Sequence, residues 1–123
     1  MANAFVHLEL ATTDLAKAKA FYGEMFGWSF VDNDMGPMGI YSTFKPQDGV
    51  GGGMYSMPGA PPAWLAYVGV DDIDEATAKA KAEGATVTRD VTEIPHIGWM
   101  SLLIDPTGAA IALFEPAPGQ PST

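Results

Sequence analysis

A histidine and a carboxylate stand two residues apart near the start of the chain. His7 and Glu9 lie in the segment FVHLELA, where apolar and polar side chains alternate with the period of a β-strand. Because successive side chains leave a strand on opposite faces, His7 and Glu9 share one face and the aliphatic residues share the other. An imidazole beside a carboxylate can bind a divalent ion, can act as a general base, or can contact a cationic ligand.

The elements that follow determine which face of this strand is covered. A helix is predicted after Asp14 or Thr13 as N-cap, and Gly27 supplies its C-terminal stop. The apolar side chains of this helix recur at the spacing of a stripe that packs on a sheet: Leu15, Ala18, Phe21, Tyr22, Met25 and Phe26. We expect the helix to cover the aliphatic face and the chemistry to lie on the other one.

Composition restricts the classes of function. The 123 residues, 47% hydrophobic and 17% charged, are typical of one globular domain. The absence of cysteine excludes disulfides and thiolate chemistry. A net charge of −9 disfavours nucleic acid and anionic membranes as partners. No secretory signal or membrane-spanning apolar run stands out, so we expect a cytoplasmic protein without a membrane partner.

The second half of the chain repeats the first. A second helix is predicted from Asp71–Asp72 to Glu83, and Gly84 is its stop, in the places that Asp14 and Gly27 occupy in the first half. Strands are predicted around it at residues 64–70, 85–89, 97–104 and 109–115. The pattern predicts two βαβββ modules in a single domain. Their predicted limits are residues 4–57 and 64–116, with a linker at 58–63 and a disordered tail at 117–123.

Three consecutive glycines interrupt the last predicted strand of the first module. Gly51, Gly52 and Gly53 lie in the segment VGGGMYSM. Such a run usually marks a bulge or a place where another group approaches the backbone closely. It lacks the Gly-Lys-Ser/Thr ending of a phosphate-binding loop and does not open a helix.

Three segments carry a family resemblance. TTDLAKAKAFYGEMFGW, VDDIDEATAKAKAEGA and DPTGAAIALFEP together resemble the glyoxalase/bleomycin-resistance/extradiol-dioxygenase (vicinal oxygen chelate) superfamily. The resemblance implies an α+β fold in which two βαβββ modules form a curved eight-stranded mixed sheet around a cleft, with the helices outside. It also implies a homodimer, and a cleft that holds a divalent ion in some members and only a small molecule in others.

The resemblance implies an incomplete metal site. His7, seven residues before Asp14, matches the first metal ligand of the lyase branch. The matching positions of the other ligands fall on Leu65, on Ala112 and among residues 51–53, which offer no donor side chain. A catalytic ion normally has about three protein ligands. We therefore expect no metal cofactor, although a divalent metal stays an alternative.

The remaining candidates are a partner for Glu9 and a ligand-binding lining. A buried carboxylate needs a partner, which here is His7, a tyrosine or a ligand cation. If a divalent ion does bind, His96 is the expected third ligand beside His7 and Glu9. The predicted ligand-binding residues are His7, Glu9, Tyr41, Met54, Tyr67, Trp99 and Phe114.

Three hypotheses of function remain open from the sequence. The first is a metal-independent binding protein for a small organic molecule of cationic or aromatic character. The second is a divalent-metal-dependent lyase or dioxygenase of the same superfamily. The third is a metal-free enzyme that uses His7 as a catalytic general base, with Glu9 nearby. Whether the protein is an enzyme is not decided by these residues.

Overall fold

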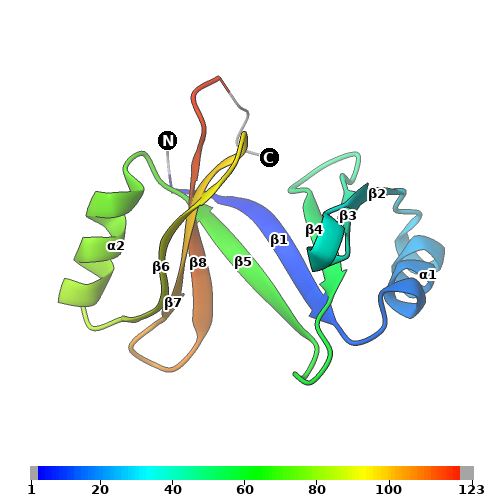
Figure 1. Ribbon diagram of the computed structural model, residues 1–123, viewed down its shortest axis with the longest axis horizontal. Helices are drawn as coiled ribbons and strands as arrows, with labels where there is room; N and C mark the ends of the chain where they lie inside the picture. The colour runs from blue at the N-terminus through cyan, green and yellow to red at the C-terminus, as the bar shows by residue number, and fades with distance from the viewer. Residues whose placement is uncertain (1–2, 120–123) are drawn as a thin grey trace. The chain divides into compact units, whose positions relative to one another are not determined.

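The computed structural model describes residues 3–119, which form eight strands, two α-helices and a short 3₁₀ helix (Figure 1). Residues 120–123 of the predicted tail lie outside this range. The elements are β1 (Phe5–Thr12), α1 (Leu15–Phe26), β2 (Phe30–Asp34), η1 (Gly36–Met38), β3 (Ile40–Phe44), β4 (Gly52–Ser56), β5 (Ala63–Gly69), α2 (Ile73–Ala82), β6 (Thr86–Ile94), β7 (Gly98–Ile104) and β8 (Ala110–Pro116).

The strands confirm two βαβββ modules in one mixed sheet. The strand order is β2-β3-β4-β1-β5-β8-β7-β6. In each module the first strand pairs in parallel with the last, β1 with β4 and β5 with β8, and the remaining pairs are antiparallel. The chain divides into an N-terminal unit, His7–Leu65, and a C-terminal unit, which contains the residues from Ala66 onward together with those up to Val6.

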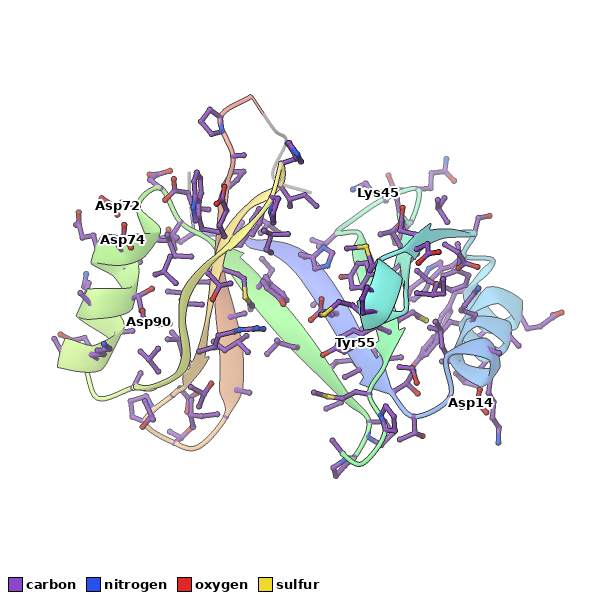
Figure 2. The ribbon with its side chains drawn as sticks, viewed as in Figure 1. Asp14, Lys45, Tyr55, Asp72, Asp74 and Asp90 are labelled. Atoms are coloured by element: carbon purple, nitrogen blue, oxygen red, sulfur yellow. The ribbon has the colours of Figure 1, made fainter. Side chains whose placement is uncertain are left out.

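Helix α1 begins and ends as predicted. The Asp14 carboxylate, labelled in Figure 2, accepts a hydrogen bond from the backbone N–H of Lys17 at 3.0 Å. This bond satisfies one of the free donors of the first turn. At the other end, Gly27 adopts a left-handed conformation with φ of 70°, and its N–H donates to the carbonyl of Gly23 at 2.9 Å.

The core of the N-terminal unit lies between α1 and the sheet. Leu10, Phe44 and Met54 are buried there. They pack against partly buried residues of α1, of β2 and of the segment before it: Leu15, Ala18, Tyr22, Trp28 and Phe30.

The expectation that the whole apolar stripe of α1 is buried was wrong. Phe21, Met25 and Phe26 are 55%, 59% and 55% exposed, and no residue of the helix is fully buried. An α-helix has 3.6 residues per turn, so Phe21 and Met25 lie beside the row of residues that contacts the sheet. Phe26 lies in the last turn of the helix.

The C-terminal unit has a tighter helix–sheet core. Ile73 of α2 is buried with Val70, Leu103 and Leu113. The Asp72 side chain caps this helix by accepting from the N–H of Glu75 at 3.0 Å, in the first turn that Figure 2 shows at Asp72 and Asp74.

Two further polar contacts tie α2 to its sheet. The Glu115 carboxylate of β8 accepts from the N–H of Ile73 at 2.9 Å. The buried hydroxyls of Thr77 and Ser101 are hydrogen-bonded at 2.9 Å. Neither helix of residues 3–119 is long and apolar enough to cross a membrane.

Candidate functional site

The face of the N-terminal unit's sheet that turns away from α1 carries its polar residues. Glu9 of β1 is in register with Gly53 of β4, and Tyr55 of β4 with Tyr41 of β3. Because side chains alternate along each strand, Glu9, Tyr41 and Tyr55 share this face with His7, opposite the residues that pack under the helix.

Tyr41 joins His7 and Glu9 in one hydrogen-bonded chain. The Tyr41 hydroxyl donates to Glu9 Oε2 at 2.9 Å. The Tyr41 hydroxyl oxygen also lies 2.8 Å from His7 Nε2. Of the three partners predicted for Glu9, the tyrosine is confirmed. We call this arrangement the His7–Tyr41–Glu9 chain.

Burial sets the charge of His7. All three members of the chain are partly buried. Burial lowers the pKa of His7 below its ordinary value of 6.5, because the imidazolium loses hydration. At neutral pH His7 is therefore a neutral imidazole, able to accept a proton or a hydrogen bond, rather than a cation.

The glycine run makes room for Tyr41. A Cβ atom at Gly53 would overlap the Tyr41 ring, and one at Gly52 would overlap the carbonyl oxygen of Leu8. The close approach that three consecutive glycines predicted is thus confirmed, by a phenol ring on one face and a neighbouring strand on the other. Gly53 is the seat on which the Tyr41 ring lies.

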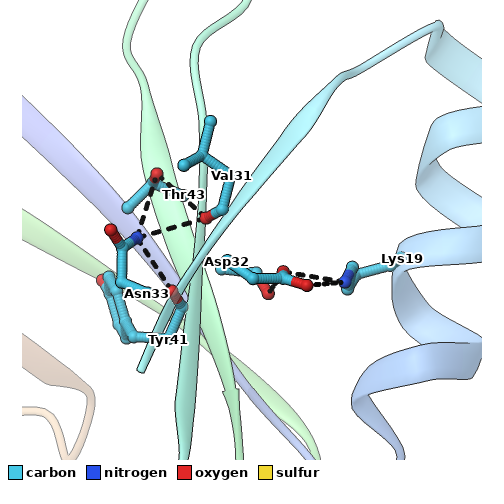
Figure 3. Close-up of polar contacts among 7 residues, drawn as sticks. Lys19, Val31, Asp32, Asn33, Tyr41 and Thr43 are labelled. Carbon is cyan, nitrogen blue, oxygen red and sulfur yellow. Dashed lines mark hydrogen bonds and ion pairs between the residues drawn. The ribbon is translucent and has the colours of Figure 1, made fainter. Parts of the chain in front are cut away.

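Polar contacts between β2 and β3 fix the strand that carries Tyr41. The Asn33 side-chain amide donates to the carbonyl oxygens of Tyr41 at 3.0 Å and of Val31 at 3.1 Å (Figure 3). The Tyr41 ring also stacks on Tyr55, with centroids 6.2 Å apart and planes 27° apart. Tyr41 is therefore held at its backbone and at its ring.

The charged side chain of Asp32 on β2 lies on the sheet face that α1 covers. Asp32 accepts two hydrogen bonds from Lys19 of α1, at 2.8 and 2.9 Å, and one from buried Ser42 at 2.6 Å (Figure 3). These contacts, first the Lys19 ammonium and then the Ser42 hydroxyl, hold the pKa of Asp32 below its ordinary value. This ion pair links α1 to the sheet and contacts no member of the His7–Tyr41–Glu9 chain.

Two of the predicted ligand-binding residues lie in helix-side cores. Met54 has no exposed surface and packs with Leu10 and Phe44 against α1. Trp99 is in register with Glu115 and packs against the core beneath α2. Both were predicted to line the ligand face, and the structure places both on the opposite side of their strands.

The other predicted residues belong to the C-terminal unit. Tyr67 and Phe114 are buried, and register places both on the sheet face that turns away from α2, with Ala112. His96 is exposed in the turn between β6 and β7, with a left-handed φ of 69°. Their part in ligand binding stays a prediction.

Sequence reasoning did not pair Tyr55 with Tyr41 and did not identify Tyr41 as the group that approaches Gly53. The available signal was parity, because Tyr55 stands two residues after Gly53 on one face of β4. Only the register of β3 on β4 shows that Tyr41 lies over this glycine. A pocket at the start of α1, lined by residues that include Asp14, Phe21 and Pro62, is not lined by His7, Tyr41 or Glu9.

Comparison with known proteins fits this repeated fold. The family model described as Glyoxalase/Bleomycin resistance protein/Dioxygenase superfamily matches residues 4–113. The chain belongs to this superfamily. Among curated relatives, the protein named "Putative glyoxylase CFP32" of Mycobacterium bovis is 37% identical over 114 residues, which cover 88% of this chain and 44% of that protein. The chain thus spans less than half the length of this relative.

A more distant relative and two solved structures extend the comparison. The protein named "Anthracycline biosynthesis protein DnrV" of Streptomyces peucetius is 28% identical, over 87% of this chain and 45% of that protein. Methylmalonyl-CoA epimerase from Mycobacterium tuberculosis has the same fold, with a TM-score of 0.71, 17% identity, and coverage of 93% of this chain and 88% of that one. A Mn(II)-bound glyoxalase from Novosphingobium aromaticivorans gives a TM-score of 0.68 at 19% identity, over 92% and 38% of the two chains.

The residues of the N-terminal unit do not fit a divalent ion. No group of three or more His, Cys, Asp or Glu side chains within residues 3–119 could hold one. His7 and Glu9 supply two donors, and the Tyr41 hydroxyl lies between them, bonded to both. The strand beside Glu9 presents Gly53, which adds no ligand.

Proposed function

We propose that the protein binds a small organic molecule at the His7–Tyr41–Glu9 chain, without a metal ion held by its own residues. The observation that carries this proposal is the pair of hydrogen bonds that Tyr41 makes to His7 and Glu9. A carboxylate and an imidazole already joined by a phenol form a preorganised polar surface, and preorganisation reduces the cost of ordering side chains when a ligand binds.

The chemistry of this face supports an aromatic or cationic ligand. Tyr41 and Tyr55 stack on each other and offer ring faces to a flat molecule or to a cation. Glu9 adds a carboxylate, and the net charge of −9 attracts cations and repels anions. Nucleic acid is excluded from the proposal on the same ground.

A thermal-shift screen tests this proposal. Flat aromatic amines and phenols form the panel, and a ligand present at 100 times its Kd stabilises the folded protein by about 2.7 kcal/mol. Tyr41→Phe removes the hydroxyl that joins the chain, so hits of the wild type should weaken in this variant. Tyr22→Phe, which removes a hydroxyl on the α1 side, is the matched control. Hits that bind Tyr41→Phe and the wild type equally would refute the site.

Catalysis by His7 is the second candidate function. The lowered pKa of His7 leaves its imidazole neutral and able to accept a proton at neutral pH, which a general base requires. Under this alternative, His7→Ala abolishes turnover of a bound ligand, and the loss of turnover is much larger than the loss of affinity. If chromatography detects no conversion of any ligand that the wild type binds, only the binding role remains.

The metal-dependent alternative, a lyase or dioxygenase, has its own measurement. Elemental analysis of the purified protein and titration with Mn²⁺, Zn²⁺ and Ni²⁺ decide whether His7 and Glu9, with His96 as predicted third ligand, hold an ion. Stoichiometric metal that is lost in His7→Ala would overturn the metal-free proposal. The sequence also predicts a homodimer and a cytoplasmic location. Light scattering tests the homodimer, and cell fractionation tests the location.

A further inference from the structure

Helix α1 has a side that its own unit does not cover. The side toward the sheet carries Lys19, which is bound to Asp32 of β2 (Figure 3). The residues on the opposite side are all exposed: Ala16, Lys17, Ala20, Phe21, Glu24 and Met25. We call these six residues the outer face of α1.

The outer face is more apolar than the exposed surface of the other helix. Phe21 and Met25 are 55% and 59% exposed. They stand four residues apart, so their side chains are neighbours on the helix surface. The exposed side chains of α2 are instead charged or alanine: Asp74, Glu75, Ala78, Lys79, Lys81 and Ala82. A contiguous exposed apolar patch of this kind indicates a surface that another molecule covers.

The charges of the outer face complement each other under a two-fold axis. Lys17 and Glu24 are seven residues apart, about 10.5 Å along the helix, which is too far for them to pair within one copy. Suppose that two copies of α1 lie antiparallel, with the axis midway between Ala20 and Phe21. Residue n of one copy is then level with residue 41 − n of the other. Lys17 of each copy faces Glu24 of the second copy, so the interface contains two opposite-charge pairs.

The same alignment also fits the sizes of the side chains. Ala20 is level with Phe21 of the second copy, so a small residue lies beside a large one, as in a well-packed helix pair.

The pocket at the start of α1 lies on the same flank of the helix as Phe21 and Met25, since Lys17, Ala18 and Phe21 line it. A two-fold axis keeps this flank on the same side of the pair, and Met25 of the second copy is level with Ala16. Met25 of each copy therefore reaches the pocket of the other, and its flexible side chain suits an irregular pocket.

We propose that the outer face of α1 is a docking surface for a second copy of this chain, and that the two helices pair antiparallel about Ala20 and Phe21. A surface that complements itself in charge and in size favours a second copy over an unrelated protein. One face of a 12-residue helix is small beside a standard protein interface, so we expect a dimer that dissociates on dilution. The interface involves no member of the His7–Tyr41–Glu9 chain.

Charge reversals test the pairing. Lys17→Glu and Glu24→Lys each replace two opposite-charge pairs with two like-charge pairs. Sedimentation equilibrium should show that the Kd of the dimer rises about 10-fold or more in either variant. An equimolar mixture of the two variants should recover the wild-type Kd, because every Glu at the interface then faces a Lys.

Two controls exclude a general electrostatic effect. Both variants stay acidic, with net charges of −11 and −7 (−9 − 2 and −9 + 2), so attraction between whole molecules would not produce the recovery. Lys81→Glu makes the same charge change at an exposed position of α2, and it should leave the Kd unchanged.

Cysteine cross-linking tests the alignment of the helices, because the chain has no cysteine of its own. A mixture of Lys17→Cys and Glu24→Cys should form a disulfide-linked pair under mild oxidation. Either variant alone should cross-link far more slowly. Its two cysteines would be separated by about 10.5 Å along the helices, beyond the roughly 7 Å that a disulfide spans between Cα atoms.

The outcomes are distinct. A wild type that stays monomeric at the highest soluble concentration would overturn the proposal. A dimer that neither charge reversal weakens would also overturn it, by showing that the copies meet at another surface, and so would a mixture as weak as its components. If a charge reversal unfolds α1, the cysteine pair still decides. These measurements need no ligand, so an empty ligand screen would count only against the proposed function.

Discussion

The two βαβββ units share a topology but place different chemistry on the sheet face that turns away from their helix. In the N-terminal unit this face carries the hydrogen-bonded His7–Tyr41–Glu9 chain. In the C-terminal unit, register places Tyr67, Met100, Ala112 and Phe114 on the corresponding face, and all four are buried. The comparison shows that a repeated fold needs its strand order and caps twice, while the polar residues need to occur only once.

On the helix-covered side of the sheet, it is the C-terminal unit that has the more buried contacts. In the N-terminal unit, α1 has no fully buried residue and leaves three large apolar side chains more than half exposed. In the C-terminal unit, α2 buries Ile73 and Thr77 and is tied to β8 by Glu115. The core of the N-terminal unit therefore depends more on its strand residues, above all on Met54.

If strand residues carry the N-terminal core, truncating Met54 should have the largest effect. We expect Met54→Ala to lower the free energy of unfolding by about 2–5 kcal/mol, because it leaves a cavity between β4 and α1. Urea denaturation measures this, with Met38→Ala as control, since Met38 is 84% exposed and its truncation should change the value by less than about 0.5 kcal/mol. Equal effects of the two substitutions would place Met54 outside the core.

If α2 is fixed by buried polar contacts as well as by packing, its hydroxyl pair can be broken in steps. Ser101→Ala leaves the buried Thr77 hydroxyl without its partner and should cost about 1–3 kcal/mol of unfolding free energy. Adding Thr77→Val removes the second hydroxyl, and we expect the double variant to recover part of that loss. A double variant that loses the sum of both single losses would contradict the pairing.

The polar face of the N-terminal unit should also make stability depend on pH. Burial holds the pKa of His7 below 6.5 in the folded state, so between that lowered pKa and 6.5 the unfolded chain binds more protons at this site. This contribution to the free energy of unfolding is complete above pH 6.5 and is lost as the pH falls through the window. Denaturation of the wild type and of His7→Asn across the window measures it, and the variant should fall less steeply. Parallel curves would contradict this sign.

The smallest expected effect compares one carboxylate from each unit. Lys19→Met removes the main hydrogen-bond donor to Asp32, so the pKa of Asp32 should rise toward its ordinary value. Asp105 is the control, because the Thr107 hydroxyl first, and then the N–H of Ala109, hold its pKa low in the C-terminal unit. Carboxyl NMR titration measures both. A shift of both groups, or of neither, would show that Lys19 does not act locally.

The fold could be predicted because its signals are local. Period-2 alternation marked β1, and Asp14, Gly27 and Asp72 marked helix ends by capping rules that need no knowledge of tertiary contacts. The extent of burial could not be predicted in the same way. The periodic stripe of α1 is wider than the part of it that the sheet covers, so Phe21 stayed exposed.

The site could be predicted only in part, for a related reason. His7 and Glu9 were assigned to one face because the following helix covers the other, and Glu9 does bond to a tyrosine. Met54 and Trp99 were assigned to the ligand face because a single strand's alternation does not say which face is which. That information comes from strand register, and for Met54 it comes from the pairing of β4 with β1.

The seat beneath Tyr41 couples two positions that are 12 residues apart in sequence, since 53 − 41 = 12. Glycine has no smaller substitute, so any replacement at position 53 enlarges it and requires a smaller residue at position 41. A substitution of glycine at position 53 is therefore compatible with the fold only if position 41 changes as well, or if the ring at position 41 is displaced. Across homologous sequences, an aromatic residue at position 41 should accompany glycine at position 53, and sequences with an aromatic residue at 41 and any side chain at 53 would contradict this coupling.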